Sequence, residues 1–153
     1  MDISQYKHKY QIKVRNYEID WQGIVHNGNY LLYFEVARVN YFKDTGMEID
    51  ERSISGNTKI VVARNELDYF NPATYDDLLD IYTRITAINN SSIRCEAEMV
   101  LTEKNIPIAK CITIHVWVDP VSNKPVPVPN YYRKKIQEFE EGRAAILWPS
   151  VEV

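Results

Sequence analysis

The sequence predicts an α+β fold, in which one curved antiparallel sheet of about five strands wraps around a single central helix and a short C-terminal helix follows. Apolar and polar residues alternate over one run near the N-terminus and over four long runs between residues 61 and 118, which is the period of β-strands. One run from residue 30 to about residue 45 instead has helical periodicity. Short turns join the four long runs, so neighbouring strands must be antiparallel. Since no repeat or boundary divides the chain, we expect a single domain over residues 1–153.

The first strand is predicted over residues 9–17, where apolar and polar side chains alternate. It leads to a loop that begins at Asp20. The helix that follows, from Tyr30 to about Thr45, has apolar residues well beyond one stripe, so we expect it to be mostly buried. Gly46 is placed to end this helix.

The remaining elements follow from the same patterns. Four long strands are predicted over residues 61–69, 79–85, 93–101 and 108–118. In the first of them one face is expected to carry Val61, Ala63, Leu67 and Tyr69. The polar connection over residues 47–57 is a candidate mobile flap. Prolines within residues 119–129 prevent the sheet from continuing, residues 132–139 predict the short amphipathic helix, and the apolar tail from residue 144 has no predicted element.

Composition and charge exclude several functional classes. The chain is 45% hydrophobic and 25% charged, and a chain of this length buries roughly two thirds of its unfolded surface, so a real core is expected. A net charge of −3 argues against general nucleic-acid binding, which needs a basic surface. No run approaches the roughly 18 apolar residues of a membrane helix, and the first residues lack the apolar core of a signal peptide, so we expect a cytoplasmic protein with no membrane insertion.

The stretch from residue 20 to residue 38 carries the chemistry that we expect. Asp20 lies in a loop with Gly23 and Gly28, and this loop leads directly into the apolar helix. The first turn of a helix leaves N–H groups without partners and carries partial positive charge. A carboxylate and an oxyanion site can therefore lie side by side, which is what water activation or direct attack on a thioester carbonyl requires.

Other chemistries fit poorly. Gly23 and Gly28 have the spacing of a phosphate loop, but Asn29 and Tyr30 stand where Lys and Ser or Thr should follow. The chain has no G-x-S-x-G elbow, neither cysteine lies in a recognisable catalytic motif, and the three histidines lack metal-ligand spacing. Serine, cysteine and zinc hydrolases are therefore disfavoured, and no metal site is expected.

The stretch from Tyr17 to Arg38 resembles the signature of the 4-hydroxybenzoyl-CoA thioesterase family and its bacterial acyl-CoA thioesterase relatives, which have the hotdog fold. Residues 69–77 resemble that family's turn between the second and third strands. The resemblance implies hydrolysis of an acyl-CoA or acyl-carrier-protein thioester to free acid and thiol, with coenzyme A as part of the substrate and no cofactor. It also implies a homodimer or homotetramer whose active site lies at the subunit interface.

The resemblance further implies roles for individual residues. Asp20 matches the catalytic carboxylate, acting either as nucleophile or as general base for water, and both mechanisms remain open. Asn27 matches the position whose backbone N–H polarises the thioester carbonyl. Family members often carry another residue type there, and because the donor belongs to the main chain this change should spare the mechanism. The implied substrate-binding residues are His26, Gly28, Tyr30 and Glu35.

Each assignment has a structural alternative. Asp20 also suits a turn or cap, His26 could simply be a hydrogen-bonded loop residue, and Glu35 could form an intrahelical ion pair with Arg38. Core packing is the simplest role for a further group, Trp21, Tyr30 and Tyr33. For the protein as a whole the alternative is a catalytically silent acyl-binding module, since fold alone does not establish function. The intact Asp20 favours the enzyme.

Overall fold

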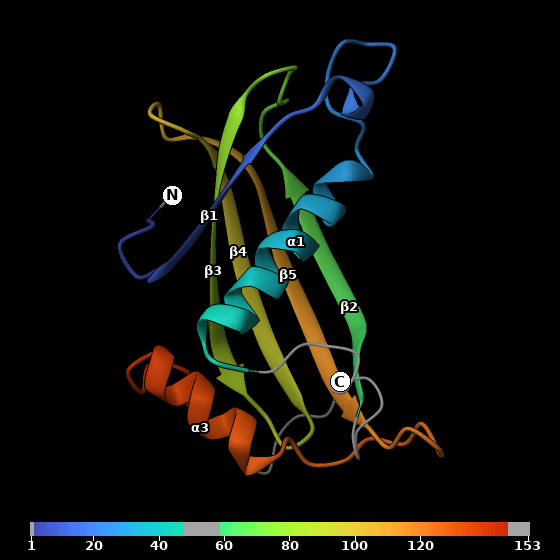
Figure 1. The fold of residues 1–153 in the computed structure, drawn as a ribbon, viewed down its shortest axis with the longest axis vertical. Helices are drawn as coiled ribbons and strands as arrows, with labels where there is room; N and C mark the ends of the chain where they lie inside the picture. The colour runs from blue at the N-terminus through green and yellow to red at the C-terminus, as the bar shows by residue number, and fades with distance from the viewer. Residues whose placement is uncertain (1, 48–58, 147–153) are drawn as a thin grey trace. The chain divides into compact units, whose positions relative to one another are not determined.

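The computed structural model describes residues 2–47 and 59–146, and its elements follow the predicted order (Figure 1). The strands are β1 (His8–Lys13), β2 (Lys59–Tyr69), β3 (Leu78–Ile88), β4 (Ser92–Leu101), β5 (Ile106–Val118) and the two-residue β6 (Ala145–Ile146). The helical elements are the 3-10 turn η1 (Asn16–Glu18), the long helix α1 (Asn29–Asp44) and the C-terminal helix α3 (Asn130–Phe139). The predicted α+β fold class is confirmed. The proposed flap falls almost wholly on residues 48–58, which lie outside the described residues.

The sheet has the strand order β1-β3-β4-β5-β2, so β1 and β2 form its two edges. Strand β1 runs antiparallel to β3, from the pair His8 and Thr83 to the pair Lys13 and Leu78. One small departure from the predicted antiparallel sheet is β6, which pairs in parallel with β3 through Ala145. The apolar tail therefore supplies one short strand within its described part.

The first strand is shorter than the sequence predicts. It ends at Lys13, and η1 follows over residues 16–18. The backbone N–H of Arg15 donates to Oε1 of Glu18 at 2.8 Å, and the guanidinium donates to both carboxylate oxygens. These local hydrogen bonds form a tight turn at residues where the alternating sequence pattern predicts that the strand continues. The turn leads the chain to Asp20.

Helix α1 agrees closely with its prediction. Beyond its last residue, Asp44, Gly46 adopts φ of 83°, a left-handed conformation that glycine accepts at little cost. The N–H of Met47 bonds to the carbonyl of Phe42 at 3.0 Å, which closes the C-terminus of the helix.

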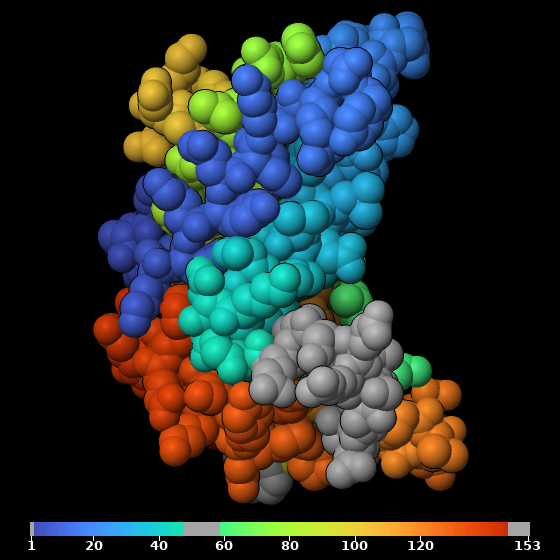
Figure 2. All heavy atoms as spheres, viewed as in Figure 1, coloured from blue at the N-terminus to red at the C-terminus, as the bar shows by residue number. Residues whose placement is uncertain are grey.

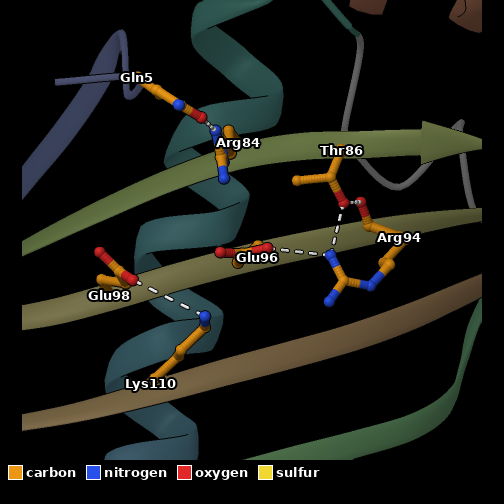
Figure 3. A network of polar contacts seen from close by, with 7 residues as sticks. All are labelled: Gln5, Arg84, Thr86, Arg94, Glu96, Glu98 and Lys110. Carbon is orange, nitrogen blue, oxygen red and sulfur yellow. Dashed lines mark hydrogen bonds and ion pairs between the residues drawn. The ribbon is translucent and has the colours of Figure 1, made fainter. Parts of the chain in front are cut away.

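The chain packs as two compact units, and the first comprises Met1–Asn40, Glu66–Arg84 and Ala97–Cys111. Its core joins the first turns of α1 to the strands around them through Tyr33, Phe34, Ala37, Leu79, Ile81, Ala97, Met99 and Ile108. On β4 the side chain of Glu98 points to the face away from α1, where it forms an ion pair with Lys110 at 3.8 Å (Figure 3). This unit contains the whole stretch that the sequence marks as functional.

The second unit comprises Tyr41–Asn65, Ile85–Glu96 and Ile112–Val153. Within its described residues the core gathers Tyr41, Phe42, Ile85, Ile93, Trp117 and Ile136. The Tyr41 hydroxyl donates to buried Glu140 at 2.6 Å and ties the end of α1 to the chain after α3. Arg94 binds both Thr86 and Glu96 (Figure 3). No helix in residues 2–47 and 59–146 is long and apolar enough to cross a membrane.

Strand β2 departs from strict alternation. Ile60 packs with the Trp117 core, whereas Val61 packs with Ile114 and its neighbours on the opposite face of β5. Yet Asn65 accepts a 2.7 Å hydrogen bond from Thr113, which lies on the Trp117 face. The facing pattern therefore shifts by one residue within β2, as a β-bulge produces, and the prediction that Val61 shares one face with the later odd-numbered residues is wrong.

Candidate active site

Asp20 lies in a tight loop that its own backbone closes. The N–H of Asp20 donates to the carbonyl of Ile24 at 2.8 Å, and the N–H of Gly23 donates to the Asp20 carbonyl at 3.1 Å. Gly23 has φ of 81° at this turn. The N–H of Gln22 donates to Oδ1 of Asp20 at 2.7 Å, as in an Asx turn. The second carboxylate oxygen, Oδ2, has no hydrogen-bond partner among the described residues, so Asp20 can shape the turn and still act on a substrate.

Five consecutive backbone amides, those of residues 25–29, show which N–H is available at the helix entrance. Four of them have acceptors: Val25 bonds to the Ala73 carbonyl at 2.9 Å, His26 to the Glu18 carbonyl at 3.0 Å, Gly28 to Nδ1 of His26 at 3.1 Å and Asn29 to the His26 carbonyl at 2.9 Å. The exception is Asn27, whose N–H has no acceptor within residues 2–47 and 59–146. The one unused amide of this run is therefore at the position that the resemblance assigns to the oxyanion donor.

A pocket of about 550 Å³ opens at this loop, lined by residues 20–22, 24–27, 30 and 69–72. From the loop, Asp20 and the exposed residue Asn27 line this pocket. Tyr69, the last residue of β2, and Phe70 after it also line the pocket, and each is about half exposed. Apolar and aromatic walls around a few polar groups are typical of small-molecule sites.

His26 and Gly28 form one local contact. Because Nδ1 of His26 accepts the Gly28 N–H, the neutral imidazole carries its proton on Nε2. A Cβ at Gly28 would lie 3.4 Å from that Nδ1, so the ring rests against this glycine. His26 lines the pocket, whereas Gly28 is not among the residues that line it.

Tyr30 lies in the core and at the pocket wall at once. It is buried, its hydroxyl accepts the Ala73 N–H at 3.1 Å, and its ring meets Tyr33 and Tyr69 edge to face. Burial is the main cause that raises the pKa of Tyr30. Core packing and a place at the substrate pocket, the two roles considered for Tyr30, are therefore compatible.

Two structural alternatives for other residues are wrong. Trp21 does not pack in the core, because its side chain is 91% exposed and lines the pocket. Glu35 does not pair with Arg38: Arg38 is buried, while Glu35 is exposed and forms no hydrogen bond or ion pair with the described residues. Glu35 also lies outside the lining of this pocket. Tyr33 packs in the core as expected.

The wall formed by residues 69–72 is the part of the site that the sequence assignments omit. Tyr69 donates its hydroxyl to the Asn27 carbonyl at 3.0 Å, and Nδ2 of Asn71 donates to the Pro107 carbonyl at 2.7 Å. The available signal is the resemblance of residues 69–77 to a family turn, which marks this segment as more than a connection.

Glu18 supports the loop that begins at Asp20 through hydrogen bonds to its backbone carbonyl. Its carbonyl accepts the His26 N–H and also Nδ2 of Asn29 at 2.9 Å. Its buried carboxylate is held by Arg15. Burial alone would raise the pKa of Glu18, but the hydrogen bonds from the side chain and backbone of Arg15 outweigh it and lower that pKa. The loop that begins at Asp20 is therefore supported by a residue whose carboxylate is paired with Arg15.

Comparisons with known proteins identify thioesterase relatives of this chain. The family model of the Thioesterase-like superfamily matches residues 14–138. The chain is 30% identical over 118 residues to the putative acyl-CoA thioesterase YneP of Bacillus subtilis (strain 168), covering 77% of this chain and 84% of that protein. It is 23% identical over 133 residues to the acyl-CoA thioester hydrolase YbgC of Escherichia coli O6:H1, covering 87% of this chain and 96% of YbgC.

Solved structures include a similar thioesterase from Thermus thermophilus, crystallised with coenzyme A and zinc. It has a TM-score of 0.77 and 28% sequence identity, and the match covers 90% of this chain and 97% of that one. The predicted hotdog fold is confirmed. Because the family model spans most of the sequence, the chain belongs to the Thioesterase-like superfamily.

Proposed function

We propose that this protein hydrolyses acyl-CoA thioesters to the free acid and coenzyme A, with Asp20 as the catalytic carboxylate. The observation that carries the proposal is the unused N–H of Asn27, which lies on the same pocket as the unpaired Oδ2 of Asp20. The names of YneP and YbgC, and the coenzyme A in the Thermus thermophilus structure, support acyl-CoA as the substrate class.

In the proposed reaction the thioester carbonyl oxygen accepts the Asn27 N–H. Asp20 either attacks the carbonyl carbon or removes a proton from an attacking water molecule. The C–S bond then breaks and the sulfur takes up a proton and leaves as the thiol. If Asp20 attacks, the acyl–Asp20 anhydride that forms is hydrolysed by a water molecule, which releases the acid and restores the carboxylate; by either route one water is consumed overall. A fixed N–H aimed at the developing oxyanion typically contributes roughly a hundred- to a thousandfold in rate. No cofactor is needed for these steps.

Of the four proposed substrate-binding residues, His26 and Tyr30 line this pocket. Tyr30 provides an aromatic wall, Gly28 lets the chain pass close to the substrate, and Nε2–H of His26 is a donor toward it. Glu35 lies outside this pocket, so its proposed contact requires a site completed by a partner subunit. Use of an acyl carrier protein instead of coenzyme A, and a cytoplasmic location, remain predictions.

We also propose a homodimer that forms through β2, with a homotetramer as a higher assembly of the same pairs. The other edge, β1, carries exposed lysines at positions 9 and 13, a common protection against strand pairing. Strand β2 has 11 residues, most of them exposed. Antiparallel pairing of two copies about Asn65 would place Arg64 opposite Glu66 of the partner subunit.

Exposed apolar residues on the first turns of α1 support the same assembly. Leu31, Leu32 and Val36 are between 38% and 57% exposed, and this part of α1 lies at the surface in Figure 2. Burying such side chains against a second copy would stabilise the pair.

The proposed activity is tested by incubating the purified protein with aliphatic and aromatic acyl-CoAs and acyl carrier proteins while measuring free thiol. We expect thiol release from at least one acyl-CoA, and its loss in Asp20→Asn. A protein that binds acyl-CoA tightly but releases no thiol would overturn the enzyme and establish the silent acyl-binding module.

A further inference from the structure

We propose that Tyr69 and His26 are positioning residues that clamp the Asn27–Gly28 peptide and thereby keep the Asn27 N–H aimed into the pocket. This inference rests on the proposed function, because it concerns the donor used in that reaction. It assigns to Tyr69, a residue of the edge strand β2, a part in catalysis that acts through the main chain of the loop.

The two side chains hold opposite ends of a single peptide unit. The Asn27 carbonyl accepts the Tyr69 hydroxyl at 3.0 Å, and the Gly28 N–H donates to Nδ1 of His26 at 3.1 Å. In a planar trans peptide the carbonyl and the N–H point in opposite directions, so holding both fixes the orientation of the plane. A clamp of this kind on one peptide requires both side chains.

The neighbouring peptide carries the donor itself. The plane between His26 and Asn27 is held at its carbonyl by the Asn29 N–H at 2.9 Å, and its other end is the unused Asn27 N–H. Residues 26–28 are exposed, so packing does not restrict their backbone. The clamp on the following peptide therefore limits rotation about the Asn27 backbone and with it the direction of the donor.

The Tyr69 hydroxyl is placed by aromatic packing. The rings of Tyr69 and Tyr30 lie 5.3 Å apart at an interplanar angle of 77°, the edge-to-face arrangement that aromatic pairs prefer. Tyr30 is itself buried and fixed by the Ala73 N–H at 3.1 Å. The packed ring of Tyr69, at the end of β2, therefore places its hydroxyl at the Asn27 carbonyl.

His26 holds the other end through an acceptor atom. Its Nδ1 can accept the Gly28 N–H only in the neutral ring that is protonated at Nε2. The Asn side chain offers an oxygen at nearly the same place as Nδ1, whereas Leu offers no acceptor. Comparing His26→Asn with His26→Leu therefore separates the effect of losing the hydrogen-bond acceptor from the effect of losing the imidazole ring.

A loosened donor affects the transition state more than substrate binding. The oxyanion forms only during the reaction, so misdirecting the Asn27 N–H lowers kcat and leaves KM nearly unchanged. We expect a loss in kcat of roughly tenfold for each broken anchor, less than the complete loss of an oxyanion donor.

The test compares Tyr69→Phe, His26→Leu and His26→Asn with the parent and with Tyr75→Phe. Tyr75 is an exposed tyrosine outside the pocket and serves as the matched control. For each variant kcat and KM for the best acyl-CoA are measured, and hydrogen exchange of the Gly28 amide is followed by NMR. We expect lower kcat in Tyr69→Phe and His26→Leu, a smaller loss of kcat and slower Gly28 exchange in His26→Asn than in His26→Leu, and near-parental kcat in Tyr75→Phe.

Several results would overturn the clamp. Parental kcat in Tyr69→Phe, or a change confined to KM, would show that Tyr69 does not position the donor. Equal loss of kcat in His26→Asn and His26→Leu would assign the effect to the imidazole itself. If the parent hydrolyses no acyl-CoA, the proposed function fails, and the clamp is then judged by Gly28 exchange alone: unchanged exchange in His26→Leu overturns it.

Discussion

At the scale of single residues, the site depends on atoms that perform separate tasks within one side chain or one amide. Asp20 uses Oδ1 to accept the Gln22 N–H and leaves Oδ2 without a described partner. His26 uses Nδ1 for the Gly28 N–H and carries its proton on Nε2. Turn formation and chemistry therefore do not compete at these positions, and conservative substitutions can separate the two.

Asp20→Asn should abolish chemistry while leaving the fold intact. The Asn side-chain oxygen can still accept the Gln22 N–H, so the turn persists, but the base or nucleophile is gone. We expect turnover to fall by roughly a hundredfold or more, as when a general base is lost. Steady-state kinetics and thermal unfolding measure the two effects, and near-parental turnover would remove Asp20 from the mechanism.

Substitution of Asn27 distinguishes its backbone from its side chain. Asn27→Ala keeps the unused N–H and should lower kcat at most severalfold, whereas Asn27→Pro deletes it and should lower kcat roughly a hundredfold or more. Circular dichroism and light scattering check that the Pro variant keeps its fold and assembly. If Asn27→Ala were as damaging as Asp20→Asn, the side chain would be the catalytic group.

At the scale of elements, the loop joins η1 to α1, and its support comes from Glu18. The lowered pKa of Glu18 means that its carboxylate stabilises the folded protein above the ordinary glutamate pKa of about 4.3, and that this contribution is lost as the pH falls through the folded-state value. The turn at η1 should therefore weaken in acid.

Glu18→Gln tests this support. At pH 7 we expect a loss of about 1–3 kcal/mol in the free energy of unfolding, because a buried, charge-assisted pair with Arg15 is removed. The difference from the parent should shrink at a pH below the lowered folded-state pKa, where Glu18 is protonated in both states. Urea unfolding at the two pH values measures it, with Glu35→Gln as an exposed, unpaired control. Equal stability of parent and variant at pH 7 would contradict the supporting role.

Local sequence patterns predict some of these elements and miss others for identifiable reasons. The loop from Asp20 to Tyr30 is contiguous, so its carboxylate, glycines and helix entrance can be recognised together. Tyr69 meets Asn27 across 42 positions, and no local period encodes that contact. The spacing of Glu35 and Arg38 suits an ion pair, but in the folded chain Arg38 is buried, Glu35 is exposed and the two side chains do not pair.

At the scale of the whole molecule, the proposed dimer would determine which groups complete the site. Strand β2 carries both Tyr69, whose hydroxyl donates to the Asn27 carbonyl, and the edge at which we propose that two copies pair. Strand pairing at β2 would then also hold the aromatic wall of the pocket. Catalysis and assembly are therefore expected to fail together when β2 is perturbed.

Charge substitutions on β2 test the proposed register. In a pair centred on Asn65, the contact between Arg64 and Glu66 of the partner subunit occurs twice, so Arg64→Glu creates two like-charge pairs. At about 1 kcal/mol or less per pair, added to the two attractions lost, the dissociation constant of the dimer should rise roughly ten- to a hundredfold. Glu66→Arg alone should do the same, and the double substitution Arg64→Glu with Glu66→Arg should restore the dimer, because the charges are again opposite.

Light scattering over micromolar concentrations measures the mass of each variant, and thiol release measured on the same samples gives its activity. Lys9→Glu on the opposite edge is the matched control, and it should change neither the mass nor the activity. A dimer that survives both single substitutions would place the interface elsewhere. A parent protein that is monomeric throughout the range would refute the assembly and the site at its interface. Rescue by the double substitution, together with loss of the dimer in each single variant, is the result expected if Arg64 and Glu66 face each other across two copies.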